Sequence, residues 1–209
     1  MARPVVCISR DLGAAGEEVG RLVADRLGAR YVDEEVIALA AERANVEAGV
    51  VADSEQRRSR LERVLGHMGD IGAVSGMMGS EPTAFREARE GRYRQLIRDV
   101  LEKIAVDGDA VIVAHGASMA LAGRDGVLRV LVTGSPDVRV RRLAQSADGD
   151  RAEKLVREGD EARAQYLKRF YEVERELPAH YDLVVCTDVL GPEGAAEIVL
   201  AAAEVVSGS

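Results

Sequence analysis

The chain has 209 residues, a length that fits one α/β domain better than two small ones. Hydrophobic residues make up 47% of it, but only 3% are aromatic and none is Trp, so Val, Leu, Ile and Ala must build the core. The formal net charge of −8 and the scarcity of stacking rings argue against a nucleic-acid-binding surface.

The chain carries no run of transmembrane length, and a strand-like run begins within a few residues of its start. We therefore expect a cytoplasmic protein that contacts no membrane. Cys7 and Cys186 both lie in apolar strand-like runs, so we expect two buried thiols in a reducing compartment.

Short apolar runs alternate with helical patterns along the chain. Most runs are apolar on both faces, which indicates a parallel sheet covered by helices on both sides. We expect strands at residues 5–9, 30–32, 110–114, 128–133 and 182–187. We expect helices at residues 17–27, 34–45, 85–106, 137–146, 152–173 and 192–206. In such a fold the ligand site lies at the carboxyl ends of the strands.

A glycine-bearing turn joins the first expected strand to the first expected helix. Gly13 and Gly16 allow successive backbone N–H groups to point, with the helix N-terminus, at one place where an anion can bind. The nucleotide-binding consensus G-x-x-x-x-G-K-[ST] nevertheless fails. Aligned on Gly16, the chain has Asp11, Glu17 and Glu18 in place of Gly, Lys and Ser/Thr.

Glu17 decides how this turn could work. A carboxylate about 4 Å from a phosphate charge costs roughly 1–4 kcal/mol, so Glu17 must turn away, pair with a cation or weaken binding. Arg10 is the nearest cation and could compensate. If the turn binds nucleotide, Asp11, Glu17 or Glu18 could hold Mg²⁺ through water. If it binds nothing, the two glutamates simply favour the positive end of the helix.

Arginines are frequent over residues 139–163. Phosphoryl transfer needs positive charge around the transferred group, and arginines supply it. Arg139 and Arg142 are three residues apart, so they share a helix face and could meet the same phosphate. Asp160 and Arg163 have the same spacing, and Asp160 could orient Arg163. The alternative is that these are ordinary surface ion pairs.

Several motifs follow one another in a recognisable order. They are Ile-Ser-Arg-x-x-Gly-x-x-Gly at 8–16, Tyr-Val-Asp-x-Glu-Val-Ile at 31–37, Val-Ile-Val-Ala-His-Gly-Ala at 111–117, and Asp-x-x-Arg-x-x-Tyr at 160–166 before Tyr-Asp-Leu-Val-Val at 181–185. Together they resemble the cytidylate kinase-like family over nearly the whole chain. The resemblance implies one domain over residues 1–209 with a three-layer α/β P-loop kinase-like fold, a five-stranded parallel sheet flanked by helices. It also implies ATP and Mg²⁺ as cofactors, small-molecule nucleotides as partners, and phosphoryl transfer from ATP to a nucleoside monophosphate.

Under this resemblance the expected site residues form three groups. The turn would bind ATP through Arg10, Gly13, Ala14, Ala15, Gly16, Glu17 and Glu18. A lid around residues 139–163 would stabilise transition-state charge through Arg139, Arg142, Arg163 and Asp160. Asp33 and His115 would lie on the side of the nucleoside monophosphate.

Two departures from the family remove positive charge from expected phosphate sites. The family commonly carries Arg at the position of Glu17 and Gly-Arg at the position of Ala114 and His115. A protonated His115 could replace an arginine in part, or a neutral His115 could cap a strand end. Two functions therefore stay open: a nucleoside monophosphate kinase, and a catalytically impaired nucleotide-binding or regulatory protein.

A dinucleotide-dependent oxidoreductase is a third alternative. Asp33 lies 20 residues after Gly13, where such folds carry a ribose-binding acid, but Ala15 breaks the G-x-G-x-x-G fingerprint. Residues 66–82 hold five glycines and three methionines without periodicity. We interpret them as a mobile loop or lid, or as a surface insertion.

Overall fold

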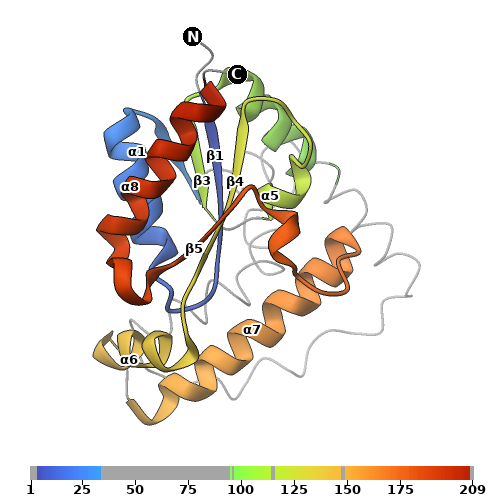
Figure 1. Ribbon diagram of the computed structural model, residues 1–209. Coiled ribbons are helices and arrows are strands. Elements are labelled where there is room, and N and C mark those ends of the chain that lie inside the picture. The colour runs from blue at the N-terminus through green and yellow to red at the C-terminus, as the bar shows by residue number, and fades with distance from the viewer. Residues whose placement is uncertain (1–3, 34–94, 96, 114–115, 147–148, 208–209) are drawn as a thin grey trace, which may run out of the picture.

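The computed structural model describes residues 4–33, 95, 97–113, 116–146 and 149–207 (Figure 1). Several predictions lie wholly or partly outside these residues: the helix at 34–45, the loop at 66–82, the first part of the helix at 85–106, the end of the third strand at Ala114, and His115.

Five strands form one sheet in which every neighbouring pair is parallel. The strand order is β2-β3-β1-β4-β5, which places β1 at the centre. The strands are β1 (Val5–Arg10), β2 (Arg30–Val32), β3 (Ala110–Val113), β4 (Val127–Thr133) and β5 (Leu183–Cys186). The predicted five-stranded parallel sheet is therefore confirmed.

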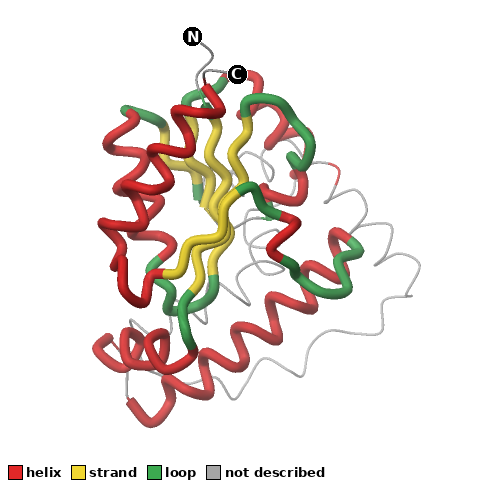
Figure 2. Tube along the Cα trace, in the orientation of Figure 1, coloured by secondary structure: helices red, strands yellow, loops and turns green. Residues whose placement is uncertain are grey.

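Helices cover both faces of the sheet, so the molecule has three layers (Figure 2). On one face lie α1 (Gly16–Leu27) and α8 (Thr187–Ser207); on the other lie α5 (Ala117–Ala120) and a helix over residues 97–107. Two further helices, α6 (Pro136–Ser146) and α7 (Gly149–Tyr171), pack together beyond the carboxyl ends of the strands (Figure 1). A short helix, η1 (Pro178–His180), precedes β5. None of the described helices combines the length and the apolarity that crossing a bilayer requires.

Strand β1 shows why the molecule has a core on each side of the sheet. Successive side chains of a strand point to opposite faces. Val6 and Ile8 pack in the core that includes α1 and α8. Val5 and Cys7 pack in the core that includes the helix over residues 97–107. Because both faces are buried, the first four residues of β1 and all four residues of β3 are apolar.

Strand β5 departs from the sequence prediction because it is an edge strand. Cys7 is buried as expected, but Cys186 is exposed, so the prediction of two buried thiols is wrong for Cys186. Only Val185 of this strand is fully covered.

Helix α8 also departs from the prediction. It begins at Thr187 rather than at residue 192, with a break at Gly191 where φ is 64° and ψ is −179°. Pro192 restarts the helix after this break, as expected for a residue whose ring fixes φ near the helical value.

Candidate functional site

The turn between β1 and α1 is closed tightly by its neighbours. Gly13 has a φ of 81°, and a Cβ atom there would lie 2.7 Å from the backbone oxygen of Arg139. At Gly16 a Cβ atom would lie 2.4 Å from Cβ of Arg10. Ala15 caps α1 in the left-handed region, at φ 62°. Glycine at 13 and 16 is therefore required by space, whatever ligand the turn binds.

The tip of the turn is held by α6 and α7. Leu12 packs against an apolar cluster that these two helices share, formed by Val140, Leu143, Ala152 and Val156. A Cβ atom at Gly159 would lie 2.9 Å from Leu12 Cδ2, so α7 approaches the turn as closely as α6 does. This anchor was not predicted from the sequence; the signal was Leu12, the one large apolar side chain of the turn.

Glu17 pairs with Arg10 across the first turn of α1. Arg10 Nη2 donates to Glu17 Oε1 at 2.7 Å, while the aliphatic part of the arginine lies against Gly16. The Arg10 side chain is 11% exposed and that of Glu17 is 48% exposed. Of the three outcomes expected for Glu17, pairing with a cation is the one observed. The arginine nearest the turn is thereby neutralised.

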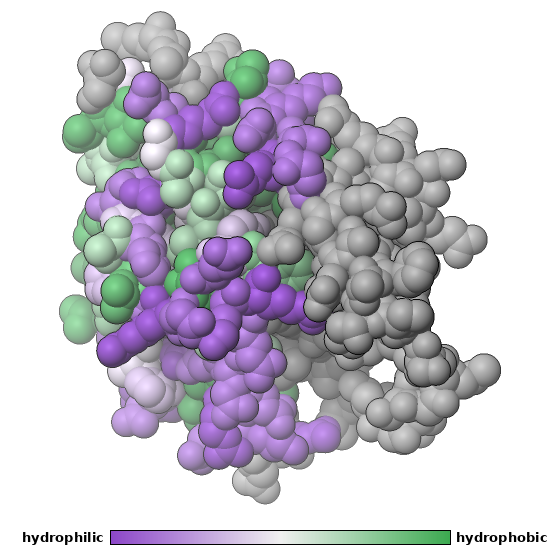
Figure 3. All heavy atoms as spheres, turned by 90° about the vertical axis from the view of Figure 1, so that its right-hand side faces the viewer, coloured by the Kyte–Doolittle hydropathy of each residue, from purple (hydrophilic) through white to green (hydrophobic). Residues whose placement is uncertain are grey.

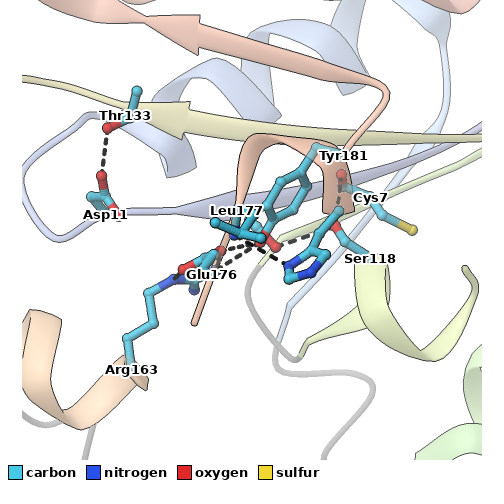
Figure 4. A network of polar contacts seen from close by, with 10 residues as sticks. Cys7, Asp11, Ser118, Thr133, Arg163, Glu176, Leu177 and Tyr181 are labelled. Atoms are coloured by element: carbon cyan, nitrogen blue, oxygen red, sulfur yellow. Dashed lines mark hydrogen bonds and ion pairs between the residues drawn. The ribbon is translucent and has the colours of Figure 1, made fainter. Parts of the chain in front are cut away.

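Asp11 is a half-buried carboxylate at the start of the turn. Thr133 Oγ1 donates to Asp11 Oδ2 at 2.5 Å (Figure 4). Burial raises the pKa of Asp11, against the opposing effects of this hydrogen bond and of Arg139 and Arg163. Asp11 is therefore the carboxylate through which the turn is coupled electrostatically to α6 and α7.

Hydroxyl residues at the ends of β4 and β5 support the turn. Thr187, which is fully buried, donates from Oγ1 to the backbone oxygen of Ala14 at 3.0 Å. Thr133 holds Asp11. The sequence analysis missed both threonines, although each directly ends an apolar run at the edge where a ligand site was expected.

Arg139 reaches the turn from α6 and is 5% exposed. Its Nη1 and Nη2 donate to the two carboxylate oxygens of Asp160, each at 2.8 Å, and Nη1 also lies 3.3 Å from the backbone oxygen of Leu12. The prediction that Asp160 orients Arg163 is wrong, because Asp160 binds Arg139. The hydrogen bonds that Arg139 donates to Asp160 raise the pKa of Arg139 against the effect of its burial.

Arg142 does not join Arg139. Its Nη1 donates to Thr187 Oγ1 at 2.6 Å, and its Nη2 donates to the Thr187 backbone oxygen at 2.7 Å. In this structure the two arginines bind different protein partners, and a shared phosphate stays a prediction. Arg139 extends to α7 and the turn, whereas Arg142 extends to the junction of β5 and α8.

Arg163, on α7, forms an ion pair with Glu176 (Figure 4). The hydroxyl of Tyr181 donates to the same carboxylate. Burial would raise the pKa of Glu176, but Arg163 and Tyr181 hold it below its ordinary value. Glu176 was not predicted; it lies 13 residues after Arg163, beyond the reach of helical spacing.

Asp33 directly follows β2. Burial raises the pKa of Tyr31 to about 12, and the carboxylates of Asp33 and Glu17 add to the rise. The Tyr31 hydroxyl is buried without a hydrogen-bond partner among the described residues, and the guanidinium of Arg21 lies 4.4 Å from the centre of its ring. Asp33 and Glu17 therefore act on the same hydroxyl, whereas His115 is outside the described residues.

The strand order discriminates between the nucleotide-binding alternatives. Dinucleotide-binding folds commonly use the order 3-2-1-4-5-6, which differs from the order observed here. A sequence model of the cytidylate kinase-like family matches residues 5–189. The chain belongs to the cytidylate kinase-like family. This membership and the strand order together argue against the oxidoreductase alternative.

Solved structures show which fold this cytidylate kinase-like chain shares. An uncharacterized protein from Eubacterium ventriosum has a TM-score of 0.64 at 14% identity, with 97% of this chain and 99% of that chain covered. Shikimate kinase from Bacteroides thetaiotaomicron has a TM-score of 0.51 at 17% identity, with 96% of this chain and 98% of that chain covered. No curated protein sequence matches the chain. The shared architecture is that of a P-loop kinase.

Proposed function

We propose that this cytidylate kinase-like chain is a phosphotransferase that binds ATP at residues 10–18 and, with Mg²⁺, transfers a phosphoryl group to a nucleoside monophosphate. The observation that carries the proposal is Arg139. Its guanidinium is buried against the tip of the turn, yet its Nε has no hydrogen-bond acceptor among the described residues. A buried donor without an acceptor is costly, and a phosphate oxygen is an acceptor that a guanidinium binds well.

The charges around the turn limit how phosphate could bind there. The left-handed backbone at Gly13 and Ala15 and the N-terminus of α1 favour an anion, whereas Asp11, Glu17 and Glu18 oppose one. The described part of the chain contains no cluster of three or more His, Cys, Asp or Glu side chains able to hold a metal. Mg²⁺ would therefore depend mainly on phosphate oxygens, and it would supply charge neutralisation when bound.

In this proposal, arginines of both α6 and α7 stabilise the negative charge of the phosphate groups. Arg139 would bind phosphate at the tip of the turn, and Arg163 would act from α7 beside Asp11. Phosphoryl transfer requires little covalent participation by protein groups, so positioning and charge neutralisation would suffice. We further propose a single cytoplasmic domain that encounters its nucleotides there, supported by a family match that spans most of the chain.

A second candidate function is nucleotide binding without turnover. It is favoured by the ion pairs that the arginines already form: Arg10 with Glu17, Arg139 with Asp160, and Arg163 with Glu176. An arginine that stays bound to a carboxylate contributes less charge to a phosphate. A regulatory protein could keep these pairs permanently.

One assay series separates the two candidates. The purified chain is titrated with ATP, CMP, UMP, AMP and a nicotinamide dinucleotide, and nucleoside diphosphate formation is followed with Mg²⁺. We expect ATP binding and diphosphate formation with one of the monophosphates. Binding without turnover supports the second candidate, and binding of the dinucleotide alone contradicts both.

Arg163 and Arg157 form a matched pair on α7 for the same assay. Arg163→Ala is expected to lower kcat roughly 100-fold and to change ATP affinity little, as expected on losing a group that stabilises transition-state charge. Arg157→Ala removes an exposed arginine of the same helix and is the control. Equal rates for the two variants would remove Arg163 from the mechanism.

A further inference from the structure

The guanidinium of Arg163 is fixed by two residues that follow α7 in the chain. Its Nε and Nη2 donate to Oε2 and Oε1 of Glu176 at 2.8 and 2.7 Å. Nη2 also lies 3.3 Å from the hydroxyl oxygen of Tyr181, which itself donates to Glu176 (Figure 4). Two parallel hydrogen bonds to one carboxylate hold the plane of a guanidinium as well as its position.

Hydrophilic residues cover much of the described part of the face in Figure 3. Arg163, Glu176 and Tyr181 are more shielded from solvent than such surface residues. The side chains of Arg163 and Glu176 are 19% and 20% exposed, and Tyr181 is 6% exposed. Partial burial weakens solvent screening, so the pair is held more firmly than a surface pair.

Tyr181 is committed as a donor to this pair. Burial, and Glu176 itself, raise its pKa to about 12, so the hydroxyl stays protonated. Its one proton is used in the hydrogen bond to Glu176, and the hydroxyl proton of the neighbouring strand residue Ser9 is used in a hydrogen bond to Ser118 at 3.2 Å. Tyr181 therefore holds the Glu176 carboxylate that holds Arg163.

One nitrogen of the Arg163 guanidinium, Nη1, remains available to a ligand. The bonds to Glu176 and Tyr181 use Nε and Nη2, so Nη1 takes no part in them. Burial lowers the pKa of Arg163, and the Glu176 carboxylate more than offsets this. Arg163 lies four residues after Gly159, which packs against Leu12 of the turn, so Arg163 lies on the face of α7 that approaches the turn.

We infer that Glu176 and Tyr181 are positioning residues that preset Arg163 beside the phosphate-binding turn and leave its Nη1 edge for an anionic oxygen. The inference rests on the proposed function for the identity of that anion. It assigns Glu176 a role that differs from that of Asp160, which holds Arg139. An arginine preset in this way does not have to be ordered during the reaction, and this lowers the entropic part of the barrier.

The test compares Glu176→Gln with Glu174→Gln. Glu174 forms a surface pair with Lys168 at 2.7 Å, with side chains 76% and 62% exposed, so the control makes the same chemical change two residues away. We expect Glu176→Gln to lower kcat roughly 10- to 100-fold with the KM for ATP within about twofold. Tyr181→Phe is expected to lower kcat roughly threefold, and Glu176→Asp, which keeps the carboxylate, should recover part of the loss.

The outcomes that contradict the inference are distinct from failure of the proposed function. Equal loss in Glu174→Gln, loss confined to KM, or no loss in either Glu176 variant overturns the inference while the kinase activity stands. If the unaltered chain binds ATP without turnover, the proposed transfer reaction is wrong, and the inference is tested by binding affinity instead. Glu176→Gln must then weaken the binding of ATP more than the binding of adenosine. Equal weakening of the two overturns the inference. If the chain binds no nucleotide, both are overturned. Tyr181→Phe, which removes one hydroxyl, gives the same readouts if Glu176→Gln does not fold.

Discussion

The P-loop consensus places a lysine at the first turn of the helix, where this chain has Glu17. Arg10, at the end of the preceding strand, forms an ion pair with Glu17. The pair joins a half-exposed carboxylate to a nearly buried guanidinium. Such a pair contributes little to folding stability. Its larger effect concerns ligands, because it uses the cation nearest the turn and leaves a carboxylate beside the N-terminus of α1.

Replacing Glu17 should therefore strengthen phosphate binding. Glu17→Gln removes a negative charge from beside Arg10 and the turn, and we expect it to raise ATP affinity roughly tenfold, equivalent to about 1.4 kcal/mol. Glu17→Arg should raise it further. Calorimetric titration with ATP and with adenosine measures the effect, which should be absent for adenosine. Glu18→Gln is the control, since it removes the same charge from the same helix turn and leaves the pair of Arg10 and Glu17 intact. Unchanged affinity in Glu17→Arg would mean that the turn does not hold phosphate.

Among the helices and strands, the hydrophobic pattern of the sequence was sufficient to predict the sheet but not the contacts between helices. The inner strands β1 and β3 were predictable because an apolar run buried on both faces leaves a continuous signal. The Asp-x-x-Arg spacing on α7 predicted a pair within one helix, whereas Asp160 binds Arg139 of α6 and Arg163 binds Glu176 beyond α7. These partners depend on how the α6–α7 pair folds back on the turn. Helical periodicity carries no information about that arrangement.

The sequence pattern also could not predict the short helix α5 or the exposure of residues on the edge strand β5. Helix α5 has four residues, which is about one turn and too short for an apolar period. The exposure of Cys186 follows from the position of β5 at the edge, because the apolar run around it looks like that of a central strand. Burial of a strand residue depends on what lies beside and above it.

The approach of the turn to α6 gives a prediction about these elements. In Gly13→Ala a new Cβ atom would meet the Arg139 backbone oxygen at 2.7 Å, in addition to the cost of a left-handed alanine. Gly28→Ala has a similar φ of 63° with nothing within 4 Å, so it carries the conformational cost alone. We expect urea denaturation to show a loss of about 1 kcal/mol for Gly28→Ala and about 2–4 kcal/mol for Gly13→Ala. Equal losses would mean that α6 moves away from the turn at little cost.

Across the whole molecule, the acidic surface contrasts with a set of interior groups that stay protonated. The chain has a formal net charge of −8. Burial raises the pKa of Cys7 from 9.0, and those of Tyr31 and Tyr181 from 10.0, to about 12 in each case. Cys7 and Tyr31 belong to strands of the sheet, and Tyr181 lies two residues before β5. Keeping these three groups protonated is therefore linked to the stability of the fold.

The stability of the protein should consequently fall in alkaline solution before its arginines lose charge. A group whose pKa is raised by folding stabilises the folded state below its unfolded pKa, and that contribution disappears as the pH rises to the folded pKa. We therefore expect the free energy of unfolding to decline from pH 9.0 to about 12. Urea denaturation under reducing conditions across this range measures the decline.

Cys7 and Cys186 supply the variants that test this account. Cys7→Ala removes one proton that the folded chain retains and the unfolded chain loses, so its decline should be shallower by up to about 1.4 kcal/mol per pH unit. At neutral pH the same variant should lose about 1 kcal/mol from the smaller buried side chain. Cys186→Ala changes an exposed thiol and should follow the unaltered protein throughout. If the two variants have the same slope above pH 9.0, the buried Cys7 thiol is not the source of the alkaline decline.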